Sequence, residues 1–207
     1  MKNSILKISG MVVLLILSLT AAGQCQEFHF PVGLAYASGS NAIVDKMKDN
    51  YFLGDNYLWP VGVTFNPYLE FKNGLGFGAA LGPIIYMYIE SRDNDDRHDD
   101  HNSYSYVIPV GLDLRYTFIK KGEVTPYIKA GFRYPITGGD YFGSGKIGAF
   151  GALGLEFLRT KRISFGLEVS YDDSKMEIKS GARGAKPNTS DQEITFGGFM
   201  IGVFAVF

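Results

Sequence analysis

The chain has 207 residues, of which 46 % are hydrophobic and 14 % aromatic, and its 20 basic and 21 acidic residues leave a formal net charge of −1. This balance lacks the basic surplus typical of nucleic-acid-binding proteins, so no nucleic-acid partner is expected. The aromatic content argues against a disordered chain, and a single cysteine cannot form an internal disulfide. Glycine, with 26 residues, exceeds its average usage of about 7 %.

The first 23 residues have the composition of a secretory signal peptide. Lys2 and Lys7 form a basic start, the apolar run Met11–Leu19 follows, and small residues up to Gly23 suit a signal peptidase. The apolar run is shorter than the roughly 20 residues that a membrane-spanning helix needs. We therefore expect residues 1–23 to be a signal peptide that is cleaved after Gly23.

Cys25 suggests an alternative, a lipoprotein whose lipidated cysteine becomes the first mature residue. Lipoprotein signals place a small residue directly before the cysteine, whereas this chain has Gln24 there. A free thiol near the mature N-terminus is the better interpretation. Residues 24–207 then form the mature domain.

Apolar and polar residues alternate along the rest of the chain. In Trp59–Phe71 every odd position is apolar, and most even positions are polar or small, which predicts a strand with two different faces. The hairpin signal Asn73-Gly74 follows directly. Eight segments show the pattern, namely Phe28–Ala37, Trp59–Phe71, Leu75–Glu90, Tyr104–Phe118, Thr125–Ile136, Lys146–Leu158, Ile163–Asp172 and Glu193–Phe207.

The links between these segments alternate in length. Those after the second, fourth and sixth segments are short, namely Lys72–Gly74, Lys120–Glu123 and Arg159–Arg162. Those after the first, third, fifth and seventh are longer and polar, namely Gly39–Asn56, Ser91–Ser103, Thr137–Gly145 and Ser174–Gln192. Strict alternation of this kind is typical of an up-and-down barrel with short periplasmic turns and long extracellular loops.

A soluble barrel or sandwich would bury the apolar face, but three features favour a membrane barrel. Several segments reach the roughly 9–11 residues of a tilted span, and the polar face is rich in Gly and Ala, as a narrow lumen requires. Aromatic residues also flank the apolar band at both interfaces. They are Phe28, Phe71, Phe118, Phe157 and Phe207 at the turn end, and Tyr36, Trp59, Tyr104, Tyr106, Tyr134 and Tyr171 at the loop end. We predict an all-β fold, an eight-stranded antiparallel up-and-down transmembrane β-barrel surrounded by outer-membrane lipids.

This architecture resembles the small outer-membrane β-barrel family typified by OmpA and OmpX, over residues 27–207. The end of the chain is its most specific feature, with alternating Phe199, Ile201, Val203, Ala205 and Phe207. This is similar to the C-terminal signal that the barrel-assembly machinery reads. The resemblance implies a Gram-negative outer-membrane protein whose last strand, ending at Phe207, is recognised by that machinery. Because family members include adhesins, envelope-stabilising proteins, secretion accessories and lipid-modifying enzymes, the fold does not select a function.

Charged residues recur on the predicted lumen face, at Glu70, Asp113, Arg115, Lys129, Arg133, Glu156 and Glu168. Arg115, Lys129 and Glu156 lie on three consecutive strands near the turns, where we expect them to form compensating ion pairs. An ion path or proton relay is one interpretation. Eight strands leave room only for side chains, so we favour a polar plug. Large residues are also expected to fill the lumen and prevent conduction, namely Tyr68, Tyr86, Tyr88, Tyr127 and Arg133.

The long link Ser91–Ser103 contains five Asp and two His residues. Such side chains can bind a divalent cation, although His98 occupies the position where a calcium loop requires Gly. We interpret the link as a solvated surface loop and assign no metal or cofactor. Its metal-binding candidates would be Asp95, Asp96, His98, Asp99 and His101.

The tripeptide His101-Asn-Ser103 resembles the His-x-Ser of lipid A deacylases, in which histidine activates a serine nucleophile. It lies in a hydrophilic loop, and the facing residues after it include Arg115 beside Asp113, so we assign no catalytic residue. We expect a non-enzymatic envelope protein whose exposed loops serve recognition or envelope stability, with a ligand that the sequence does not identify. The alternatives are a lipid-processing enzyme of the deacylase type and a narrow conduit for small apolar molecules.

This topology predicts the outcome of protease treatment of intact cells. Cleavage should occur within Ser91–Ser103 or Ser174–Gln192, because these loops face the medium, and mass spectrometry of the released fragments would locate the cuts. Cleavage within Arg159–Arg162 would contradict the topology.

Overall fold

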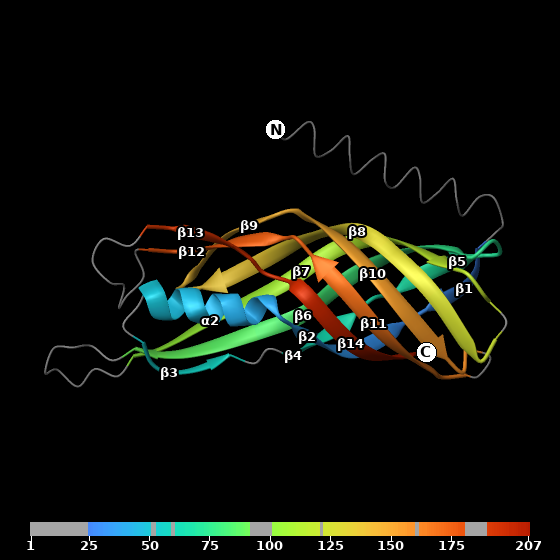
Figure 1. Cartoon of the computed structure of the whole chain (residues 1–207), viewed down its shortest axis with the longest axis horizontal. Coiled ribbons are helices and arrows are strands. Elements are labelled where there is room, and N and C mark those ends of the chain that lie inside the picture. The colour runs from blue at the N-terminus through green and yellow to red at the C-terminus, as the bar shows by residue number, and fades with distance from the viewer. Residues whose placement is uncertain are drawn as a thin grey trace, which may run out of the picture.

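The alternating segments fold into a closed antiparallel β-barrel (Figure 1). Its wall has eight positions, each made of one strand or of several shorter strands in line, and we call each position a stave. This computed structural model describes residues 25–50, 53–58, 61–91, 101–120, 122–159, 162–180 and 190–207. The predicted signal peptide lies outside the described residues. Within those residues, no helix is both long enough and apolar enough to cross a membrane.

Several staves consist of more than one strand. The elements are β1 (Cys25–His29), β2 (Pro31–Ala37), α2 (Gly39–Asn50), β3 (Leu53–Leu58), β4 (Val61–Phe65), β5 (Tyr68–Phe71), β6 (Leu75–Ser91), β7 (His101–Thr117), β8 (Val124–Gly139), β9 (Phe142–Lys146), β10 (Gly148–Phe157), β11 (Ser164–Asp172), β12 (Lys175–Ile178), β13 (Gln192–Thr195) and β14 (Gly198–Val206). Neighbouring strands pair around the wall in the order β2, β4, β6, β7, β8, β10, β11 and β14. The ring closes where β14 pairs with β2, placing Val203 opposite Leu34.

The apolar residues face outward, as the alternation predicts. Phe132, Leu153 and Ile201 are each more than 60 % exposed on the outer wall. Exposed aromatics lie at both ends of the apolar band, namely Phe28, Phe118 and Phe207 at the turn end and Tyr36, Tyr104, Tyr106, Tyr134 and Tyr171 at the loop end. The prediction was wrong for Phe71, which is buried at the end of β5. Trp59 lies outside the described residues.

The two faces of β6 exchange places partway along the strand. Leu81 pairs with Val110 and Ile85 with Val107, so four steps on β6 span three on β7. A one-residue bulge moves every later side chain to the opposite face. It occurs at Gly82, whose φ is +100° and where a Cβ would lie 2.3 Å from the Val63 carbonyl oxygen, so only glycine fits.

This bulge corrects the prediction for two tyrosines that were expected in the lumen. Tyr86 is 48 % exposed, and Tyr86 and Tyr88 both pack against the exposed ring of Tyr104, with ring centroids 5.7 and 5.3 Å apart. Ile85 and Met87, which the uninterrupted alternation places outside, are buried. The upper interior is therefore more apolar than the sequence pattern indicated.

The predicted long loops contain regular structure at the loop end, on the left of Figure 1. The link Gly39–Asn56 was predicted as a long polar loop, and it contains α2 and part of β3. The helix buries Ile43 and Met47, which lie one turn apart on one face. Strands β9, β12 and β13 form a separate three-stranded sheet; β9 and β12 come from residues expected mainly in loops, whereas β13 takes the start of the predicted last barrel strand, whose barrel part begins at Gly198. We call α2, β3 and this sheet the collar.

The bulge in β6 generates a prediction about stability. Met87→Ala should lower the free energy of unfolding by about 2–5 kcal/mol, because it empties a buried position. Tyr86→Ala, the adjacent control on the outer face, should cost much less. Urea unfolding in lipid, followed by heat-dependent gel mobility, measures both, and the reverse ranking would show that β6 keeps its alternation through Gly82.

Candidate functional site: the charged interior

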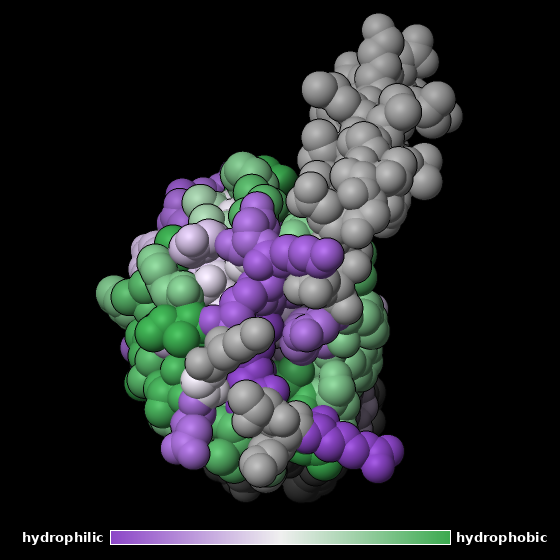
Figure 2. All heavy atoms as spheres, turned by 90° about the vertical axis from the view of Figure 1, so that its right-hand side faces the viewer, coloured by the Kyte–Doolittle hydropathy of each residue, from purple (hydrophilic) through white to green (hydrophobic). Residues whose placement is uncertain are grey.

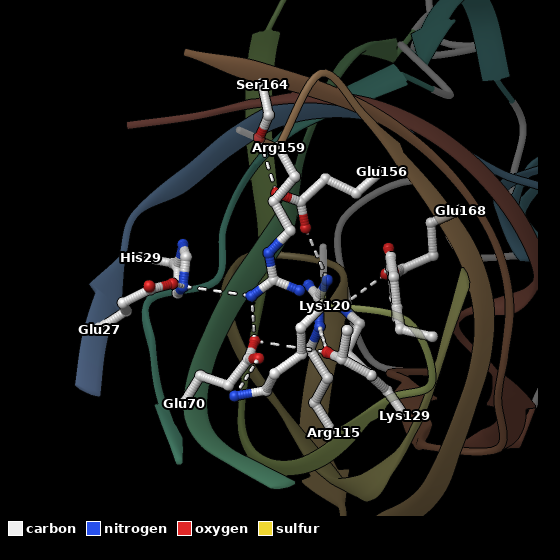
Figure 3. Close-up of polar contacts among 12 residues, drawn as sticks. Glu27, His29, Glu70, Arg115, Lys120, Lys129, Glu156, Arg159, Ser164 and Glu168 are labelled. Carbon is white, nitrogen blue, oxygen red and sulfur yellow. Dashed lines mark hydrogen bonds and ion pairs between the residues drawn. The ribbon is translucent and has the colours of Figure 1, made fainter. Parts of the chain in front are cut away.

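The charged cluster nearest the turn end is centred on Glu70 of β5. Its carboxylate accepts a hydrogen bond from Arg159, in the link after β10, and its Oε1 lies 3.1 Å from Nζ of Lys120. The Thr117 hydroxyl adds a hydrogen bond of 3.3 Å. Glu70 was predicted to face the lumen, but its two cations were missed because they lie in the short links rather than on the alternating strands. Figure 3 shows both reaching into the interior towards Glu70.

The next pair joins Arg115 of β7 to Glu156 of β10. Arg115 Nη2 lies 2.7 Å from Glu156 Oε2, and Ser164 donates a hydrogen bond of 2.7 Å to the other carboxylate oxygen. The Arg115 guanidinium also lies 3.6 Å from the centroid of the Tyr127 ring and 4.4 Å from that of Tyr68. Arg115 and Glu156 are both almost fully buried, so hydrogen bonds and cation–π contacts compensate their desolvation.

Lys129 pairs with Glu168 and not with Glu156, which corrects part of the prediction. Its Nζ lies 2.6 Å from Glu168 Oε2, and the Tyr127 hydroxyl donates a hydrogen bond of 2.7 Å to the same carboxylate. The strand register explains the choice. Glu168 lies opposite Gly154, which in turn lies opposite Tyr127. A Cβ on Gly154 would lie 2.1 Å from the Tyr127 ring, so the glycine leaves the space through which Tyr127 reaches Glu168.

The fourth pair, towards the middle of the barrel, joins Arg133 of β8 to Asp113 of β7. Two hydrogen bonds of 2.5 and 3.0 Å connect the guanidinium to the two carboxylate oxygens, a bidentate geometry that fixes both side chains. The guanidinium carbon lies 3.8 Å from the centroid of the Phe150 ring. Phe150 belongs to a cluster of buried apolar residues in the loop-end half of the barrel. Arg133 therefore lies where the charged part of the interior meets the apolar part.

The interior of the loop-end half is mainly apolar, although Ser105, Asp172 and Ser174 are also buried there. Its buried side chains come from the wall, from α2 and from the collar sheet, namely Ala37, Ile43, Met47, Ile85, Met87, Val107, Tyr141, Phe142, Phe150, Ala152, Met176, Ile178, Ile194, Phe196 and Met200. Two small cavities, of about 20 and 30 Å³, lie beside the ion pairs. Each has room for roughly one or two water molecules. Ion pairs therefore occupy the described interior towards the turn end, and mainly apolar side chains occupy it towards the loop end.

The remaining sequence candidates do not form a second site in the described residues. His29 lies at the rim, stacked on Tyr68 with centroids 4.6 Å apart, and its Nε2 lies 3.3 Å from Glu27. Asp95, Asp96, His98 and Asp99 lie outside the described residues, as do the side chains of His101 and Ser103. Among the residues that are described, no group of three His, Cys, Asp or Glu could hold a metal ion.

Comparison with known proteins agrees with this architecture. The family model of the outer membrane protein beta-barrel domain matches residues 9–207. The outer membrane protein OprG from Pseudomonas aeruginosa has a similar fold, with a TM-score of 0.52 at 15 % identity, covering 89 % of this chain and 97 % of OprG. Neisserial surface protein A (NspA) aligns with a TM-score of 0.38 at 14 % identity, covering 86 % of this chain and 94 % of NspA. No curated protein matches the chain in sequence.

The closed wall, its apolar outer face and its two aromatic belts define an integral outer-membrane β-barrel protein. The chain belongs to the outer membrane protein beta-barrel domain family. In such barrels the short turns face the periplasm and the longer loops the exterior. The turn end is therefore the periplasmic end, and the collar lies on the extracellular side.

The ion pairs predict an unequal response to the removal of two glutamates. Glu156→Ala should lower the free energy of unfolding by about 3–5 kcal/mol, because it leaves Arg115 charged and buried without its partner. Glu123→Ala, in an exposed link at the same end, should change it by less than about 0.5 kcal/mol. Urea titration in lipid vesicles measures both, and equal midpoints would mean that water solvates the lumen charges.

Proposed function

We propose that the protein is a non-conducting, non-enzymatic barrel whose extracellular end carries recognition or contributes to envelope stability. The observation that carries this proposal is the filled interior. Ion pairs occupy the periplasmic half and an apolar cluster the other half, with cavities of only about 20 and 30 Å³ between the charges. A barrel filled in this way anchors its extracellular surface, and the wall itself transports nothing.

The collar gives the extracellular end a stable surface. Its sheet is held by Lys146 and Lys175, which both contact Glu193. Hydrogen bonds from these two lysines hold the pKa of Glu193 below its usual range. Helix α2 anchors the collar to the barrel interior through the buried side chains of Ile43 and Met47. The extracellular end therefore presents an ordered surface, which suits recognition.

A conduit for small apolar molecules is the second candidate, and the apolar upper interior is the observation that favours it. Against it, this interior is occupied by its own side chains, and the wall is closed beside the β6 bulge. A Cβ on Gly62 would lie 2.4 Å from the Ile84 carbonyl oxygen, so β4 and β6 are in direct backbone contact. Passage of an apolar molecule would require the apolar cluster to move apart and the β4–β6 contact to open.

Planar-bilayer recordings test the main proposal. The unmodified protein should show no large, stable conductance steps, because side chains fill its interior. Phe150→Ala removes a buried ring from that interior and should make brief openings more frequent, whereas Phe132→Ala, an exposed ring on the adjacent strand, should not. Large stable steps in the unmodified protein would overturn the proposal.

The enzymatic alternative needs its own measurement. Lipid A mass spectra from cells with and without the protein should be identical if it has no deacylase activity. Loss of an acyl chain that depends on the protein, and that Ser103→Ala abolishes, would establish the alternative.

A further inference from the structure

A groove of about 520 Å³ lies on the outer wall near the periplasmic end, where β2, β14 and β11 run side by side. Ala205 lies at its floor, because it is the smallest outward residue between Phe165 on one neighbouring strand and Val32 on the other. Phe157, Leu167 and Leu34 extend its sides. The volume is within the range of about 300–1,000 Å³ found for ligand sites. The groove is apolar throughout and lies in the part of the wall that faces lipid.

A second hollow, of about 320 Å³, adjoins the groove at the barrel mouth. Ser164 and Phe207 line it, and each is next to, or two residues from, a groove residue, so the two hollows share one rim. Figure 2, which faces this end, shows hydrophilic residues gathered at the mouth with hydrophobic residues around the perimeter. The polar mouth therefore meets the apolar wall at the rim.

Four charged residues line this mouth hollow, of which Glu156 and Arg159 are already paired with Arg115 and Glu70, which leaves Glu27 and Arg162 as its two exposed charges. Arg162 is exposed and forms no ion pair with any residue that the structure describes. Glu27 has a side chain that is 62 % exposed, and its partner is His29, at 3.3 Å. Since Arg162 lies three residues before Phe165, its Cα is at most about 11 Å from that of Phe165 in the groove wall. That separation suits the distance between the phosphate of a lipid and the upper part of its acyl chain.

We propose that this groove and mouth form a binding site for one phospholipid of the periplasmic leaflet, with a zwitterionic headgroup that ends in a primary ammonium. Its acyl chain lies along Ala205, its phosphate binds Arg162, and its ammonium binds Glu27. The two charges match both charges of such a headgroup. An anionic headgroup without an amine would satisfy Arg162 but face the like charge of Glu27.

The shape of the site favours a lipid over a second copy of the chain. Two barrel walls are both convex and meet along a line, whereas the groove is an open apolar hollow that a flexible acyl chain can fill. The charges also lie at one end only, which matches an amphiphile with a single polar end. A dimer contact would place apolar side chains against both ends of the groove.

Native mass spectrometry of the whole barrel in detergent tests the site, with phosphatidylethanolamine and phosphatidylglycerol of identical acyl chains as probes. The unmodified protein should bind one phosphatidylethanolamine saturably, about tenfold more tightly than phosphatidylglycerol, which corresponds to about 1.4 kcal/mol. Ala205→Leu should fill the groove and weaken binding of both lipids. Glu27→Gln should leave lipid binding but remove the preference for phosphatidylethanolamine, and Arg162→Gln should weaken both lipids.

Matched controls separate this site from general lipid contact. Ala130→Leu adds the same volume to an exposed alanine on β8, and Lys72→Gln removes an exposed cation in a different periplasmic turn. Neither should change binding. Equal adducts in all variants would show ordinary surrounding lipid and overturn the proposal, as would equal affinity for the two lipids. The mass of a protein dimer that disappears in Ala205→Leu would show that a second copy of the protein occupies the groove. That result would also overturn the proposal.

Discussion

Backbone hydrogen bonding in the bilayer is the constraint on which the rest of this structure depends. No water reaches the hydrocarbon region to satisfy a free strand edge, so the sheet must close on itself. Here closure is made by β14 against β2, the last and first staves, with Val203 opposite Leu34. Closing the ring with eight staves leaves an interior wide enough only for side chains. The narrow lumen, and with it the absence of a wide channel through the described interior, follows from that number.

Polar side chains in so narrow a space must compensate one another. Each of the four lumen carboxylates, Glu70, Asp113, Glu156 and Glu168, has one or two cations within contact distance. Glycine makes the longer contacts possible, as at Gly154, where the missing side chain lets Tyr127 reach Glu168. The upper half solves the same packing problem with apolar residues, and α2 covers it. The interior is thus filled by ion pairs in one half and by an apolar cluster in the other. The proposed surface function depends on both halves being filled.

The outer wall shows that an apolar lipid-facing surface need not be uniform. Small residues such as Ala205 between larger neighbours produce a groove, and the rim below it carries Arg162 and Glu27. The same alternation that turns apolar residues outward therefore also determines where lipid can fit closely. The two ends therefore differ in structure, with the collar at one end and a rim that carries exposed charges at the other.

The sequence by itself determined the eight staves, the inverted barrel and the charged lumen positions, because period-two alternation depends only on which face each residue meets. It missed the exchange of faces in β6, since a one-residue bulge at Gly82 leaves no mark in composition. It placed Ile43 and Met47 in a long polar link, and only the fold shows that they lie on one face of a helix and are buried at the barrel mouth. Tertiary structure alone decided which charges pair. Lys129 pairs with Glu168 rather than with Glu156 because of the strand register and the space left at Gly154. Both are relations between neighbouring strands, which the sequence of a single strand does not contain.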